Sequence, residues 1–147
     1  MKRLFAFFVF LVFLGSLSGC VRKNDTLSQA ADNIATIDII YVSPYAVVSL
    51  ETLKTTEAIV TIPNEHFSLL IEELRLLPSH SNFLDPPQGI SKHALRIGYQ
   101  DGSMEWICSI ARLYYANGKT KWEYFSYDDD FDALVLKWID ISEGEAM

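Results

Sequence analysis

The sequence predicts an α+β domain in which two amphipathic helices pack on one face of an antiparallel sheet of about five strands. Two dipeptides that favour tight hairpins, Asp101-Gly102 and Asn117-Gly118, each stand between segments rich in apolar and aromatic residues. Two other segments, 63–77 and 131–138, carry apolar residues at the spacing of one helical face. Because the chain has 147 residues and half of them are apolar, we expect one domain with its own core.

The first part of this domain predicts two strands and a helix. Residues 36–48 are rich in isoleucine, valine and tyrosine, and Pro44 ends or bends this strand. A polar connection at 51–56 leads to a second strand at 58–62. Pro63 begins the helix, because its missing N–H costs nothing there. In the first strand, alternation places one set of side chains on one face, namely Ile37, Ile39 and Tyr41, and the other set on the opposite face, namely Asp38, Ile40 and Val42. In the helix, the 3.6-residue period predicts a buried face made of Phe67, Leu70, Ile71, Leu74 and Leu77.

The second part predicts a hairpin from 94 to 110. A two-residue type I′ turn at Asp101-Gly102 sets Ile97 opposite Trp106 and Leu95 opposite Cys108. In this register the large apolar residues of both strands lie on one face.

A second hairpin turns at Asn117-Gly118 and sets Leu113 opposite Trp122. The apolar positions change from even to odd numbers near Ile110-Ala111. We therefore expect a bulge there, within one long strand.

The aspartates 128–130 precede the last helix. Acidic residues stabilise the N-terminus of a helix through capping and through its dipole. A calcium loop is the less favoured interpretation, because the glycine and the distal glutamate of an EF-hand loop are missing.

The first twenty residues have the layout of a secretory signal. Lys2 and Arg3 form a short positive region, an unbroken apolar run follows over 4–14, and small or polar residues lead to Cys20. A run of this length is too short to span a bilayer comfortably as a permanent helix. The final residues, Leu17-Ser18-Gly19-Cys20, resemble the lipobox of bacterial lipoproteins.

This resemblance covers residues 1–20 only. It implies thioether attachment of a diacylglycerol to Cys20, cleavage between Gly19 and Cys20, and a further acyl chain such as palmitate on the new N-terminus. It thereby implies anchoring to the outer side of a bacterial membrane. Val21 stands where an aspartate commonly retains Gram-negative lipoproteins in the inner membrane, so the outer membrane is favoured if the organism is Gram-negative. The alternatives are an ordinary secretory signal and a retained transmembrane helix.

The expected organisation follows from this boundary. It comprises a signal peptide at 1–19, a lipidated Cys20 with a flexible tether to residue 35, a single domain at 36–142 and a tail at 143–147. The formal net charge is −7, and it falls to −9 when Lys2 and Arg3 leave with the signal. Such an acidic chain is unsuited to non-specific nucleic-acid binding and to anionic lipid heads, so membrane attachment has to be covalent.

The residues that could carry chemistry are scattered along the chain. The three histidines, His66, His80 and His93, lack metal-ligand spacing, and we expect neither a metal nor a cofactor. Cys108 alternates with Trp106 and Ile110 on an apolar strand face, which favours an inert, buried thiol. Nucleophile-elbow, phosphate-loop and dinucleotide motifs are absent from the sequence. A site made of dispersed carboxylates stays open, because its members meet only in the fold.

One mixed aromatic and basic patch stands out on this acidic chain. Tyr114 is expected on the strand face away from Leu113, together with Arg112, Lys119 and Lys121. Tyrosine and arginine are favoured at protein interfaces. The alternative is an ordinary solvent face whose lysines discourage edge pairing.

We therefore expect a membrane-anchored, non-enzymatic domain that binds an envelope protein or another ligand. An immunity or inhibitor lipoprotein is the second hypothesis, because an acidic domain can cover a basic toxin surface. A small envelope hydrolase is the third, and a cleft holding acids with perturbed pKa values would support it.

Overall fold

The structure is a computed structural model that describes residues 27–42, 49–79, 92–124, 127 and 130–145. The expected signal and lipobox, Pro44, His80 and the aspartates 128 and 129 therefore lie outside the described residues. The elements in chain order are η1 (Ala31–Asn33), β1 (Ile34–Tyr41), α2 (Leu50–Thr55), β2 (Ala58–Thr61), η2 (Asn64–His66), α3 (Phe67–Leu76), β3 (His93–Tyr99), β4 (Met104–Ile107), β5 (Ala111–Ala116), β6 (Lys119–Tyr124) and α4 (Asp130–Glu145).

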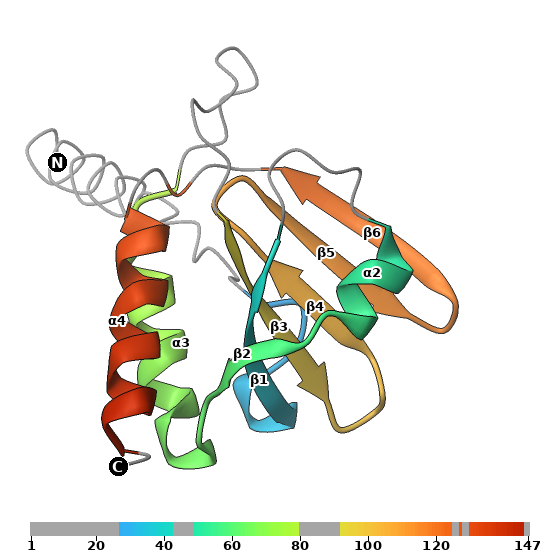
Figure 1. Ribbon diagram of the computed structural model, residues 1–147. Helices are drawn as coiled ribbons and strands as arrows, with labels where there is room; N and C mark the ends of the chain where they lie inside the picture. Colours follow the sequence, from blue (N-terminus) through green and yellow to red (C-terminus); the bar gives the residue numbers. More distant parts are fainter. Residues whose placement is uncertain (1–26, 43–48, 80–91, 125–126, 128–129, 146–147) are drawn as a thin grey trace, which may run out of the picture.

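The fold is α+β, with an antiparallel sheet of six strands in the order β2-β1-β3-β4-β5-β6 (Figure 1). The expected count of about five strands is too low, because the chain reverses at Ser109-Ile110. There the Cys108 N–H donates to the Ala111 carbonyl at 2.9 Å, and β4 pairs with β5. The change in apolar parity near Ile110 therefore comes from a missed hairpin and not from the expected bulge.

The β3–β4 hairpin has a different turn from the predicted one. The Tyr99 N–H donates to the Ser103 carbonyl, and Gly102 at φ +80° donates to the Tyr99 carbonyl, both at 3.0 Å. This is a three-residue loop with glycine in the left-handed position, which shifts the register by one residue. Ile97 consequently lies opposite Glu105, and not opposite Trp106. Because of this shift, every β4 side chain lies on the face opposite to the one we expected.

The β5–β6 hairpin confirms the predicted register. Leu113 lies opposite Trp122, and Ala111 lies opposite Tyr124. Asn117 and Gly118 have φ values of 51° and 74°, which is the conformation that a two-residue type I′ turn requires.

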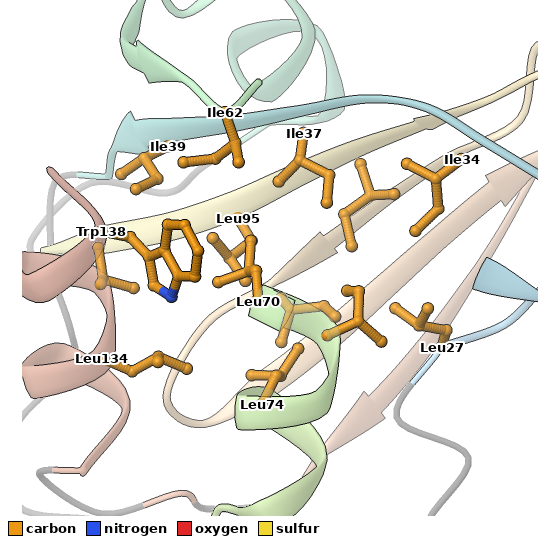
Figure 2. Packing of buried hydrophobic residues seen from close by; sticks show 14 of the residues in the cluster. Leu27, Ile34, Ile37, Ile39, Ile62, Leu70, Leu74, Leu95, Leu134 and Trp138 are labelled. Carbon is orange, nitrogen blue, oxygen red and sulfur yellow. The ribbon is translucent and has the colours of Figure 1, made fainter. Parts of the chain in front are cut away.

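One face of the sheet, here called the two-helix face, carries the larger core. Buried side chains of α3 and α4 share one cluster with Ile37, Ile39, Leu95 and Ile97 of the central strands. Figure 2 shows Leu70 and Leu74 of α3, with Leu134 and Trp138 of α4, directed at this face. Within the described part of the chain, no helix has the length and apolar character needed to cross a bilayer.

The opposite face, here called the α2 face, is covered by the helix α2, where we expected a polar connection. Leu53 of α2 packs with Ile40, Trp106 and Leu113 in a second cluster. Arg96 fixes the helix end, because its Nη1 donates to the Thr56 carbonyl at 2.7 Å and its Nη2 pairs with Asp38 at 2.7 Å. A cation beside the last carbonyls of a helix is favourable.

The structure places residues 27–35 against the domain, although we expected them in the tether. Leu27 is buried in the core of the two-helix face, and β1 begins at Ile34. At the other end α4 continues to Glu145, past the expected boundary at 142.

Gly102→Ala tests the revised turn. We expect the free energy of unfolding to fall by about 1 kcal/mol, because alanine resists the positive φ although nothing lies within 4 Å of its Cβ. Gly144→Ala, in α4 with equally open surroundings, is the control and should leave stability unchanged or raise it by up to about 1 kcal/mol. Urea denaturation measures both, and equal stabilities for Gly102→Ala and the unchanged chain would contradict the turn.

Candidate functional site

A fully buried carboxylate, Glu105, stands near one end of the two-helix face. The shifted β3–β4 register places it there, on the same side of β4 as Ile107. A buried charge is costly unless it is paired and hydrogen-bonded. The partners of Glu105 therefore determine what this part of the molecule does.

Three separate segments provide those partners. The Ser28 backbone N–H donates to Glu105 at 3.0 Å, and the Ser28 hydroxyl donates to it at 2.9 Å. The Tyr99 hydroxyl donates to Oε2, and Arg112 Nε lies 3.4 Å from Oε1. One carboxylate thus joins β3, β4 and β5 to the segment that precedes β1.

The same arrangement raises the pKa of Tyr99 well above its usual range. Burial is the main cause, and the neighbouring Glu105 charge adds to it. The phenol consequently stays protonated as a donor at any physiological pH. A donor locked in this way is suited to holding a carboxylate and unsuited to catalysing proton transfer near neutral pH.

Gln29 extends the connection to the β3–β4 turn and to Tyr114 of β5. Its Nε2 donates to Ser103 Oγ at 2.6 Å, to Asp101 at 2.9 Å and to the Tyr114 hydroxyl at 3.0 Å. The hydrogen bonds from Ser103 and Gln29 lower the pKa of Asp101. Residues 27–29 are therefore docked by both apolar and polar contacts.

The structure brings the predicted patch residues together but leaves only part of the patch available. Tyr114 lies opposite Lys121, and Lys119 and Lys121 are both exposed. Arg112, in contrast, pairs with Glu105 and Glu123, and only 13% of its side chain is exposed. The Tyr114 hydroxyl is used by Gln29. The two lysines are thus the members that a partner can reach.

Sequence reasoning missed the most exposed aromatic pair of the described residues. All six residues of β6 are exposed, and Trp122 and Tyr124 retain 48% and 60% of their accessible surface. Their rings stack at 6.2 Å between centroids. Trp122 lies opposite Leu113 as predicted, but Leu53 of α2 packs with Leu113 while Trp122 stays half exposed.

The other candidate residues, Cys108, His66 and His93, each contact neighbouring parts of the fold. Cys108 packs at the edge of the α2-face cluster, burial raises its pKa, and its Sγ contacts the Ala111 carbonyl at 3.4 Å. His66 packs on Trp138, and His93 Nδ1 lies 3.8 Å from Asp132. Among the residues with a described position, no cluster of His, Cys, Asp and Glu side chains is arranged to hold a metal ion.

No protein-family model, curated protein or solved structure matches this chain.

Tyr99→Phe tests the buried pair through its pH dependence. A raised folded-state pKa means that the stabilisation is complete below the unfolded pKa, near 10.0, and declines as the pH rises above it. The unchanged chain should lose up to about 1.4 kcal/mol of stability per pH unit there through Tyr99 alone. Denaturation between neutral and alkaline pH should show a shallower decline for Tyr99→Phe. Tyr124→Phe, at an exposed ring, should keep the original slope; a shallower slope for this control and not for Tyr99→Phe would contradict the assignment.

Proposed function

We propose that this chain is a membrane-anchored bacterial lipoprotein whose extracytoplasmic domain acts by binding a partner and not by catalysis. The observation that carries the binding role is β6, a fully exposed edge strand that combines lysines with the aromatic rings of Trp122 and Tyr124. Tryptophan and tyrosine dominate the energetics of protein interfaces. On a chain of net charge −7, this strand provides a local basic and aromatic contact surface.

The docked N-terminal segment supports presentation close to a membrane. Leu27 is fixed in the core, and only six residues lie between it and Cys20. The seven Cα–Cα steps from Cys20 to Leu27 reach at most about 25 Å when fully extended. A lipid on Cys20 would therefore hold the domain near the bilayer, where a high local concentration makes weak contacts sufficient.

The reactive groups of the described residues support binding over catalysis. Glu105 is held by Ser28, Tyr99 and Arg112, all of which orient it inside the domain. The raised pKa of Cys108 disfavours the thiolate that nucleophilic attack requires. These groups serve the fold, while among the described residues the ion pair of β6 side chains is the one between Glu123 and Arg112.

Cys20→Ala tests the anchor. We expect the unchanged chain to incorporate labelled palmitate and to sediment with membranes, and the variant to lose the label and leave the membrane fraction. Membrane extraction with carbonate and detergent, followed by fractionation, measures the second effect. An unchanged chain that sediments with membranes but incorporates no palmitate would contradict a lipid anchor and favour a retained helix.

Lys121→Glu tests the contact surface. After cross-linking in living cells and pull-down of the full chain, we expect partner recovery to fall about tenfold, which corresponds to loss of about 1.4 kcal/mol. Arg75→Glu is the control, because it makes the same change of charge on the exposed side of α3.

Equal recovery with both variants would remove β6 as the contact surface. Recovery of a secreted toxin by the unchanged chain would instead favour the immunity hypothesis, to which the acidic charge of the chain lends support.

A further inference from the structure

Among the described residues, no strand pairs with the outer edge of β6, so this edge can accept another strand. In the described part of the chain, β5 is its single neighbour. The pair Ala116 and Lys119 closes a two-residue turn, so it exchanges both backbone hydrogen bonds, and this pattern repeats at every second residue. The backbone groups of Thr120, Trp122 and Tyr124 consequently point outward, away from β5.

We propose that the partner of this edge is a second copy of the chain, bound by antiparallel pairing of β6 with β6. The proposal deepens the function proposed above, because it names the occupant of the same strand. In such a pair the strands are related by a two-fold axis, and the contact is self-complementary. The register then determines which charges meet.

Three registers near the middle of β6 would hydrogen-bond its outward backbone N–H and C=O groups, with the two-fold axis at residue 121, 122 or 123. The charges of the side chains favour one of them. Centring the axis on Lys121 places two lysines opposite each other, although each Lys119 then lies opposite Glu123 of the other copy, and centring it on Glu123 places two glutamates opposite each other. Each of these two arrangements contains a repulsive pair of like charges. Centring it on Trp122 places Lys121 of each copy opposite Glu123 of the other, which gives two attractive pairs.

The selected register also completes a row of alternating charges. Glu105 on β4 contacts Arg112 on β5, and Arg112 contacts Glu123 on β6. Half of the Glu123 side chain is still exposed, with a relative accessibility of 50%, so its carboxylate is open to a further cation. Lys121 of the second copy would provide that cation. Lys121 therefore disfavours the register centred on itself and favours this one.

The exposed rings fit the same arrangement. Trp122 would meet Trp122 of the second copy, and Tyr124 would meet Thr120, all on the α2 face. Pairing would cover the two rings that the single chain leaves 48% and 60% exposed. Aromatic cross-strand pairs are among the favourable pairs in antiparallel sheets.

The symmetry agrees with two chains anchored in one membrane. The two-fold axis that relates antiparallel strands within a sheet is perpendicular to the sheet, so both copies turn the same face in the same direction. Leu27 belongs to the core of the two-helix face in each copy. Leu27, the described residue nearest to Cys20, would thus lie on the same side of the joined sheet in both copies, as two anchors in one bilayer require.

Single cysteines in the full chain, expressed in its native membranes, test the register. Trp122→Cys should form a disulfide with itself under mild oxidation, because hydrogen-bonded pairs place the Cα atoms about 5.5 Å apart. Thr120→Cys and Tyr124→Cys should each fail to self-link but should link when co-expressed. Leu76→Cys, on the most exposed apolar residue of α3, measures random collision, and the unchanged chain measures the background from Cys20 and Cys108.

Charge reversal tests the same contact in detergent without new cysteines. Lys121→Glu and Glu123→Lys each produce two repulsive pairs in a dimer, so sedimentation should show self-association weakened about tenfold or more. Mixing the two variants restores opposite charges at both pairs and should restore a heterodimer. Restoration by mixing excludes misfolding as the cause of the single-variant losses.

The proposal is overturned if Trp122→Cys links no more than Leu76→Cys, or if the mixed charge variants stay monomeric. A link from residue 122 to a different protein, with no self-linked product, would also overturn it while leaving the proposed binding function intact. Self-linking by a chain that fails to incorporate palmitate would support the dimer and contradict the anchor.

Discussion

The buried Glu105 carboxylate is the constraint on which this end of the molecule depends. Its charge is fully removed from water, so the folded state requires Ser28, Tyr99 and Arg112 to stay in place around it. Breaking such a set by removing one partner costs about 3–5 kcal/mol, because an uncompensated charge remains. The carboxylate therefore links the docking of the N-terminal segment to the register of β3, β4 and β5.

Different helices cover the two faces of the sheet. α3 and α4 cover β1 and β3 on one face, while the short helix α2 covers the middle of the other face. Arg96 lies on the opposite face of the sheet from Glu105. It holds the end of α2 through an ion pair with Asp38 and a hydrogen bond to the Thr56 carbonyl. Neither layer extends to β6, so the edge strand keeps its aromatic rings and lysines exposed. Apart from the pairing of Glu123 with Arg112, the described contacts leave the side chains of this strand turned to solvent.

The two Asx-Gly dipeptides show why prediction succeeded in one hairpin and failed in another. Asn117-Gly118 has positive φ at both residues, as a two-residue turn requires. At Asp101-Gly102 only the glycine is left-handed, because a type I turn with a bulge uses one such residue. The alternation of β4 did not decide between these options, since apolar side chains stand on both of its faces. The burial of Glu105 could consequently not be predicted from the sequence, because it depends on the pairing of β4 with its neighbouring strands.

The sequence by itself determined the α+β class, the apolar faces of β1, α3 and α4, the β5–β6 register and the grouping of Lys121 with Tyr114. These features rest on local periodicity and on turn residues that act within a few positions of one another. Only the tertiary structure decided the sixth strand, the position of α2, the docking of residues 27–29 and the exposure of Trp122. Each of these depends on contacts between distant segments, because a polar helix or an apolar strand acquires its burial from whatever packs on it.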